Sequence, residues 1–274
     1  MTDGFERLRL TVEGSVARVV LARPEVRNAF DDGLIEELTR AFGVCAADPQ
    51  ARVVVLSGDG PSFCAGADVN WMRRAGAYTR EENERDAERM ARMLRTIDAC
   101  PKPVVALAHG AAIGGGVGLV AAADIAIAAE GTVFSLAEVK LGILPAVISP
   151  YVLRAIGARN ARNVFLTGER FDAGEARRIG LVHEVVPAAD LEAAGGRKVA
   201  ALLASGPEAV GAAKRLIEQV SGKSPDDAMA LTVRAISERR ASAEAREGLS
   251  AFLEKRRPSW TQAHDSAEKT EAKE

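Results

Sequence analysis

The sequence predicts an α/β protein whose C-terminal part is helical. Strand-like and helix-like segments alternate as far as about residue 190, and only helical patterns follow, broken at Gly206-Pro207 and Ser224-Pro225. The hydrophobic share of 47% and the charged share of 27% are ordinary for a globular protein. A chain of 274 residues can bury a substantial core in one or two domains.

The N-terminal segments show the alternation most clearly. Two short strand-like runs are separated by Glu13-Gly14-Ser15, which is typical of a hairpin turn. Asp31 and Asp32 can cap the helix that follows, because a carboxylate accepts the free N–H groups of a first helical turn. We expect strands at 6–12 and 16–22, a helix at about 33–46, a buried strand ending near Ser57, and a loop over GDGPSFCAGAD.

The middle of the chain contains an amphipathic helix and a glycine-rich apolar stretch. Residues 80–98 carry charges on one face and an apolar stripe on the other, and Pro101 and Pro103 end this pattern. Residues 104–129 have only His109 and Asp124 as ionisable groups, so their length approaches that of a membrane span. Five glycines in their middle favour a buried strand, a loop, a short helix and a second buried strand.

The second half is predicted to be mainly helical. Ser149-Pro150 opens a helix that Gly157 closes, and Asp172 opens another that Gly180 closes. Residues 182–186 are typical of a last strand. We expect a core at residues 1–195, a helical region at 196–260, and a disordered tail at 261–274, whose sequence is polar without periodicity.

Composition excludes several classes of function. A net charge of -2 argues against a surface dominated by attraction to nucleic acid or to membranes, so neither is an expected partner. The three cysteines are widely spaced and form no C-x-x-C pair, and there are only three histidines, which predicts reduced thiols and no metal site. The N-terminus has no apolar signal segment. We therefore expect a cytoplasmic protein.

Two loops rich in glycine and alanine, at residues 64–68 and 110–116, follow buried strands and lead into expected helix starts. Small residues let a ligand approach the backbone, and N–H groups at a helix N-terminus point outward. Two such groups aimed at one point form an oxyanion hole. Tight packing of helix on sheet also favours small residues and stays an alternative for each loop.

A dinucleotide-binding fold is a competing interpretation of the second loop. Residues 116–121 match G-x-G-x-x-A, and Glu138 follows about 20 residues on. The preceding strand, however, ends near Ala108, well before the first glycine of the match. The position of the strand therefore argues against this fold.

Six segments taken together resemble the enoyl-CoA hydratase/isomerase (crotonase) superfamily, and they span residues 5–260 in the order and spacing of the family. They are SFCAGADV (62–69), KPVVALAHGAAIGGG (102–116), AADIAIA (122–128), FSLAEVKLGILP (134–145), LTGERFDAGEARRIGLVHEVVP (166–187) and EGLSAFLEKRRP (247–258). The resemblance implies a spiral of ββα units with a helical C-terminal region that builds homotrimers or homohexamers. It also implies an enoyl-CoA hydratase that binds an acyl-CoA thioester and needs no cofactor, since coenzyme A is part of the substrate.

The resemblance assigns roles to particular residues. The backbone N–H groups of Ala67 and Gly115 would bind the thioester oxygen, and Glu138 would move a proton at carbon. The loop from Ala65 to Asp68 would line the channel for coenzyme A. The full set of implied substrate-binding residues is Ala65, Gly66, Asp68, Gly114, Arg27, Trp71 and Lys255, with Arg256 beside the last as a further partner for phosphate.

The sequence departs from the family at one catalytic position. Hydratases of the family hold a water between two glutamates; the second matches Glu138, but Gly118 stands where the first is expected. The apolar surroundings of Glu138 predict a raised pKa, which suits proton exchange with carbon. The alternative is an ordinary acid at a helix start beside Lys140. Double-bond isomerases of the family also use a single glutamate, so isomerisation remains a second possibility.

Three parts of the sequence most resemble bacterial methylglutaconyl-CoA and isohexenylglutaconyl-CoA hydratase-like proteins: residues 134–157, the segment GADVNWM (66–72), and Gly118. Those proteins are associated with the breakdown of leucine and acyclic terpenes. Their substrates bear an extra carboxylate, so we hypothesise that this carboxylate or Glu138 positions the water. Arg73 or Arg74 could orient the carboxylate, or could simply face solvent. A non-catalytic acyl-CoA binder and an RNA binder are the alternatives of another class; acids interleaved with the bases argue against RNA.

Overall fold

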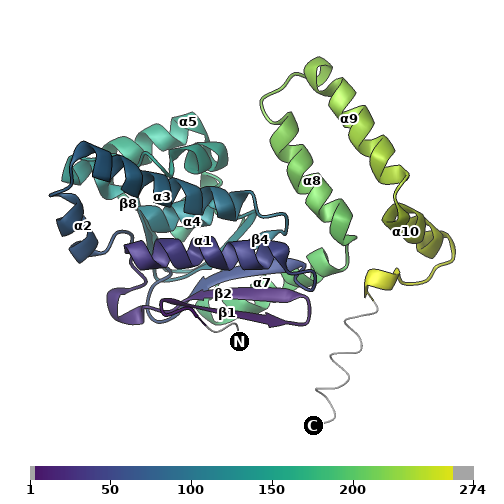
Figure 1. Cartoon of the computed structure of the whole chain (residues 1–274), viewed down its shortest axis with the longest axis horizontal. Coiled ribbons are helices and arrows are strands. Elements are labelled where there is room, and N and C mark those ends of the chain that lie inside the picture. Colours follow the sequence, from purple (N-terminus) through teal and green to yellow (C-terminus); the bar gives the residue numbers. More distant parts are fainter. Residues whose placement is uncertain (1–3, 262–274) are drawn as a thin grey trace, which may run out of the picture.

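The computed structural model, which describes residues 4–261, contains a six-stranded and a three-stranded sheet (Figure 1). The order in the larger sheet is β1-β2-β3-β4-β6-β9, and in the smaller one β5-β7-β8. The strands are β1 (Leu8–Glu13), β2 (Val16–Leu21), β3 (Val53–Gly58), β4 (Val104–Ala108), β5 (Ala111–Ile113), β6 (Ile125–Ala129), β7 (Val133–Ser135), β8 (Arg170–Asp172) and β9 (Glu184–Val186). Only β1 and β2 pair antiparallel in the larger sheet; its other described pairs are parallel.

Most of the longer helices begin at a polar cap that the sequence supplies. Asp31 accepts the N–H of Leu34 to start α1, and Thr79 forms a capping box with Glu82 to start α3. The helices are α1 (Asp32–Ala47), α2 (Val69–Ala75), α3 (Arg80–Asp98), α4 (Gly115–Ala122), α5 (Ser149–Thr167), α6 (Ala173–Arg178), α7 (Leu191–Leu203), α8 (Pro207–Val220), α9 (Pro225–Arg240) and α10 (Ala243–Leu253), with short 3-10 turns η1 (Pro24–Val26), η2 (Ala137–Leu141) and η3 (Ala188–Asp190).

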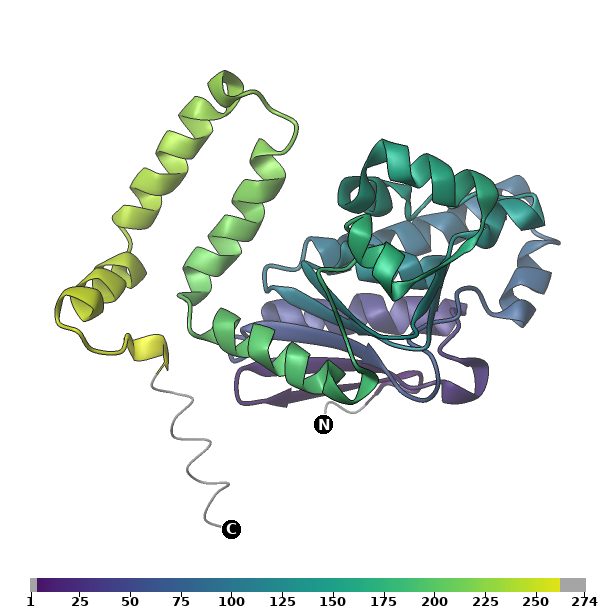
Figure 2. The same ribbon diagram turned by 180° about the vertical axis from the view of Figure 1, so that it is seen from behind.

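Helices cover both faces of the larger sheet, as the buried, valine-rich strands require. On one face α1, α3 and α4 enclose the main core, which includes Leu38 and Leu94. On the other face α7 packs on β3, β4 and β6 through Leu191 and Ala194. Figure 2 shows α7 crossing the sheet on the side turned away in Figure 1.

Pairs of strands followed by a helix repeat along the middle of the chain. β4 belongs to the larger sheet, β5 to the smaller, and α4 follows; β6, β7 and then η2 with α5 repeat this pattern. The arrangement is the predicted spiral of ββα units. It brings the loops after β3, β5 and β7 to one side of the molecule, where the candidate site lies.

The last helices leave the core as a separate arm, α8 to α10 (Figures 1 and 2). The expected boundary between residues 195 and 196 falls inside α7, because α7 packs on the sheet; the chain leaves the sheet at Gly206-Pro207 instead. The Arg52 guanidinium donates to the carbonyls of Leu203, Ser205 and Trp260 and ties the base of the arm to the core.

Several local predictions are confirmed and several needed the structure. The helix at 80–98 has the expected bounds. Gly157 is non-helical (φ 70°, ψ 159°), so the helix that Ser149 opens ends there as predicted, and a second helix follows it within α5 as far as Thr167. The sequence patterns did not predict α2 or the strands β5, β7 and β8, whereas β9 lies within the strand predicted at 182–186. No helix within residues 4–261 is long and apolar enough to span a membrane. Residues 262–274 of the expected tail lie outside the described residues.

Candidate active site

The first glycine-rich loop runs alongside Phe30 and leaves one N–H group unused. Phe30 donates to the carbonyl of Gly66 (2.7 Å), and Asp68 donates to the carbonyl of Phe30 (2.8 Å). In this parallel bridge the N–H of Ala67 points the opposite way, and it donates to no acceptor within residues 4–261. Gly66 has φ +87°, and a Cβ there would lie 2.9 Å from the carbonyl oxygen of Ile113, so only glycine fits.

The second loop presents another unused N–H group, at the start of α4. Gly114 (φ +50°) donates to the carbonyl of Ser135 at 2.8 Å, which turns the chain into the helix. Gly115 is the first helical residue, so its N–H has no intrahelical acceptor, and no hydrogen bond within residues 4–261 uses it. A Cβ on Gly115 would lie 2.8 Å from the Phe30 ring and 2.6 Å from Met90 Cε, which explains the glycine by packing.

The two loops are hydrogen-bonded to each other. Cys64 donates to the carbonyl of Ala111 (3.0 Å) and accepts from the N–H of Ile113 (3.0 Å). A Cβ on Gly116 would lie 2.5 Å from the carbonyl oxygen of Cys64, so the start of α4 rests directly on the first loop. Each of the two adjoining loops therefore presents one unpaired N–H group, the kind of donor from which an oxyanion hole is built.

Glu138 places a carboxyl group at the same loops. It lies in η2, directly after β7, and a Cβ built on Gly114 would be 2.9 Å from its Oε1. Its Oε2 is buried and has no hydrogen-bond partner within the described residues. Burial raises the pKa of Glu138, because the charged carboxylate loses its hydration. A carboxyl group whose pKa is raised holds a proton more readily, which suits proton transfer to a substrate bound at these loops.

Glu138 lies in the first turn of η2 and Lys140 in its last turn, as the simpler interpretation of an ordinary helix-start acid beside Lys140 expects. The Lys140 side chain lies along Gly168, with its Cε 3.2 Å from a Cβ built there. No ion pair joins the two residues within the described chain. Gly118 is buried in α4 and offers no second carboxyl, as its sequence position indicates.

The predicted coenzyme A loop is held by its own backbone and by one buried carboxylate. Ala65 donates to the carbonyl of Arg27 (2.9 Å), so these two residues lie together, with Arg27 exposed and at φ +54°. Asp68 accepts from the N–H groups of Asn70 (2.8 Å) and Trp71 (3.4 Å). Its carboxylate therefore caps α2, which leaves the backbone of this segment as the part available to a ligand.

Trp71 carries an unusual buried donor. The side chain is 9% exposed, and its indole Nε1 has no hydrogen-bond partner within residues 4–261. A buried donor without an acceptor costs about 1–3 kcal/mol, so a ligand acceptor would be favoured there. The neighbouring arginines are exposed and engaged elsewhere: Arg73 donates to Asn70 (3.0 Å) and Arg74 to Asp32 (2.8 Å).

Lys255 is the predicted site residue that this chain does not bring to the loops. It follows α10 on the arm, on the opposite side of the molecule from α2 in both views (Figures 1 and 2). The adjacent Arg256 forms ion pairs with Glu247 (2.8 Å) and Glu254 (2.7 Å), which occupy its guanidinium.

Asn28 supports the site and was not identified from the sequence. It is fully buried at φ +56°, and its Nδ2 donates to the carbonyls of Asp59 and Ser62, both at 2.8 Å. Its Oδ1 accepts the N–H of Arg23 at 2.8 Å. One side chain thus joins the segment before α1 to the start of the first glycine-rich loop. The residue type was the only signal in the sequence, since Asn tolerates positive φ.

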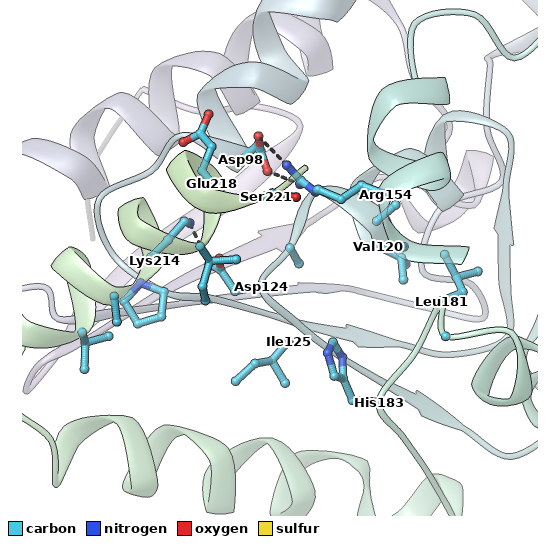
Figure 3. A pocket seen from close by; sticks show the side chains of 18 of the residues that line it. Asp98, Val120, Asp124, Ile125, Arg154, Leu181, His183, Lys214, Glu218 and Ser221 are labelled. Atoms are coloured by element: carbon cyan, nitrogen blue, oxygen red, sulfur yellow. Dashed lines mark hydrogen bonds and ion pairs between the residues drawn. The ribbon is translucent and has the colours of Figure 1, made fainter. Parts of the chain in front are cut away.

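A separate cavity of about 600 Å³ lies at the base of α8 (Figure 3). Lys214 Nζ pairs with Asp124 at 2.7 Å and Arg154 with Asp98 at 3.3 Å across it. None of its lining residues belongs to the two glycine-rich loops or to η2, so it is distinct from the candidate site. No group of three or more His, Cys, Asp or Glu residues able to hold a metal ion is found within residues 4–261.

Comparison with known proteins decides the family. The sequence profile of the enoyl-CoA hydratase/isomerase family matches residues 11–263, nearly the whole chain. The chain belongs to this family. It is 37% identical over 263 residues to a protein of Rhodobacter capsulatus described as a probable enoyl-CoA hydratase, covering 94% of this chain and 98% of that one.

Solved structures show the same crotonase-type α/β fold in other members of the enoyl-CoA hydratase/isomerase family. An enoyl-CoA hydratase from Shewanella pealeana has a TM-score of 0.91 at 41% identity, covering 93% of this chain and 96% of that one. Pseudomonas aeruginosa AtuE has a TM-score of 0.90 at 37% identity, covering 93% and 100%. The predicted fold and superfamily are therefore confirmed.

Proposed function

We propose that this chain is an enoyl-CoA hydratase that adds water to an α,β-unsaturated acyl-CoA, with Glu138 as its single acid. The observation that carries the proposal is the position of the Glu138 carboxyl against Gly114, with Oε2 unpaired, beside the free N–H groups of Ala67 and Gly115. The similarity to proteins described as enoyl-CoA hydratases supports the same reaction.

The reaction follows from these three groups. The thioester oxygen accepts hydrogen bonds from the N–H groups of Ala67 and Gly115, which stabilise the negative charge that develops on it. The oxygen of water bonds to the β-carbon, and the π electrons move toward the thioester to form an enolate. Neutral Glu138 then gives its proton to the α-carbon. The raised pKa of Glu138 favours the neutral form needed for this step.

We propose further that the acyl group is branched and carboxylated, as in 3-methylglutaconyl-CoA. Water that attacks carbon must lose a proton, and Gly118 provides no side chain to accept it. A carboxylate on the substrate supplies the missing acceptor.

A panel of enoyl-CoA substrates tests both levels of the proposal. Hydration is followed by loss of the absorbance of the conjugated thioester, and isomerisation is scored separately by product analysis. We expect hydration of 3-methylglutaconyl-CoA to exceed that of crotonyl-CoA, which has no second carboxylate. Faster turnover of crotonyl-CoA would overturn the substrate choice, and binding without turnover of any substrate would overturn the enzymatic function.

Double-bond isomerisation is the second candidate function, and the absence of a carboxyl at Gly118 favours it. In this reaction a carboxylate removes a proton from the α-carbon of a β,γ-unsaturated thioester, the double bond shifts, and a proton is returned to the γ-carbon. One carboxyl group can do both if it reaches both carbons. The same panel separates the two reactions, because an isomerase converts a 3-enoyl-CoA to its conjugated isomer without adding water.

We propose that the chain assembles as a homotrimer or a homohexamer through the arm. Large apolar side chains on its helices are exposed, including Met229, Val233, Leu249, Phe252 and Leu253, with Phe252 at 79%. Apolar patches of this kind commonly mark contacts between subunits. Size-exclusion chromatography with light scattering measures the mass of the particle; a monomer at micromolar concentration would contradict the proposal.

A further inference from the structure

The space beside Gly118 is filled by the side chain of Ile148. A Cβ built on Gly118 would lie 2.4 Å from Ile148 Cγ2 and 3.1 Å from Ile148 Cβ. The next side chain, Leu94 of α3, is at an ordinary contact distance of 3.6 Å. Any side chain at position 118 therefore requires Ile148 to move, whereas Leu94 leaves room for a methyl group.

Ile148 has little freedom to move. It is 3% exposed and stands directly before α5, where its carbonyl accepts the N–H groups of Tyr151 (3.2 Å) and Val152 (3.1 Å). Its β-branched side chain has few accessible rotamers. α4 packs against both α3, which carries Leu94, and α5, which Ile148 directly precedes. These two side chains form an apolar wall beside Gly118.

The wall lies next to Glu138. Gly118 donates to the carbonyl of Gly114 at 3.2 Å, the hydrogen bond that opens α4, so these two glycines lie about one helical turn apart, roughly 6 Å along the axis. The carboxyl of Glu138 lies against the first of them and Ile148 against the second. Around α4 the site thus has one carboxyl position and, one turn further, one apolar position.

We propose that Ile148 is a specificity-determining residue that keeps this a one-carboxyl site. It closes the second position to a carboxylate and to the water that a carboxylate would hold, so the chain favours acyl groups that bring their own proton acceptor. In that reaction the water oxygen bonds to the β-carbon, its proton goes to the substrate carboxylate, and Glu138 protonates the α-carbon. The inference rests on the proposed hydratase function.

Thermal unfolding tests the wall without reference to activity. Gly118→Ala is expected to lower the apparent Tm by about 2–6 °C, because its methyl group overpacks against Ile148. In an Ile148→Ala background the same change is expected to leave Tm level or raise it, since alanine favours a helix over glycine. Leu94→Ala is the matched control, a buried truncation that should give no such rescue. Equal effects of Gly118→Ala in all three backgrounds would overturn the proposed wall.

Activity tests what the wall does. Gly118→Glu alone is expected to leave crotonyl-CoA hydration unimproved, because Ile148 blocks the new carboxylate. Gly118→Glu with Ile148→Ala is expected to raise the rate with crotonyl-CoA, relative to 3-methylglutaconyl-CoA, by about tenfold or more. A folded double variant with no such change, or an equal gain from Gly118→Glu alone, would overturn the inference. Failure of the wild-type chain to hydrate either substrate would instead overturn the proposed function, while the unfolding experiment would still report on the wall.

Discussion

Replacing Glu138 by glutamine removes the proposed acid with little change in shape. Oε1 packs at the Gly114 backbone and Oε2 has no partner within the described residues, so the amide fits without breaking a hydrogen bond of the carboxyl to another side chain. We expect kcat to fall by about 10²–10⁴-fold, the usual contribution of a positioned general acid, or roughly 3–5 kcal/mol of activation free energy. Binding of coenzyme A should change little, because the thioester donors are backbone groups.

The assay is steady-state hydration of 3-methylglutaconyl-CoA, followed by absorbance, for the wild type and Glu138→Gln. Glu130→Gln is the matched control, since it makes the same change at an exposed position. Retention of more than about a tenth of the wild-type kcat by Glu138→Gln would refute the assignment of this residue as the acid. A comparable loss in Glu130→Gln would show that the effect is not specific to the site.

The pH dependence of stability provides an independent check on the same residue. Burial raises the pKa of Glu138 in the folded chain above its unfolded value, which is about 4.3 for glutamate. Its contribution to stability is therefore fully present below that unfolded value and is lost as pH rises through the folded pKa. Glu138→Gln stays neutral at every pH. Its free energy of unfolding, compared with that of the wild type, should therefore rise from acidic to alkaline pH, and urea denaturation at a series of pH values measures this difference. A pH-independent difference would contradict the burial argument.

Three further substitutions probe the loops. Gly115→Ala should lower kcat by about tenfold or more, because its methyl group meets the Phe30 ring and shifts the donor N–H; kinetics at saturating substrate measure this. Asn28→Ala should destabilise the fold by about 2–4 kcal/mol in urea denaturation, since it leaves buried backbone groups unpaired; a loss under about 0.5 kcal/mol would contradict that role. Trp71→Phe should lower kcat/KM for 3-methylglutaconyl-CoA by roughly tenfold and leave crotonyl-CoA unaffected; equal effects on both would argue against an indole hydrogen bond.

Local signals in the sequence were sufficient for elements whose ends are set by nearby residues. Asp31 caps α1 as predicted, and Pro207 and Pro225 start α8 and α9 at the predicted breaks. The strands β5, β7 and β8 could not be predicted, because three residues carry too little periodicity and their pairing partners are distant in sequence. The site residues came largely from family resemblance, and their catalytic roles remain predictions.

What the sequence by itself determined is the list of chemical groups: two glycine-rich loops, one carboxyl at Glu138, and glycine in place of an acid at position 118. Only the tertiary structure decided how these groups meet. Glu138 reaches Gly114 because β7 pairs with β5, and the space at Gly118 is closed because α5 begins beside α4 with Ile148. Contacts of this kind join residues 24 to 30 positions apart, and a linear pattern does not specify which side chain fills which space.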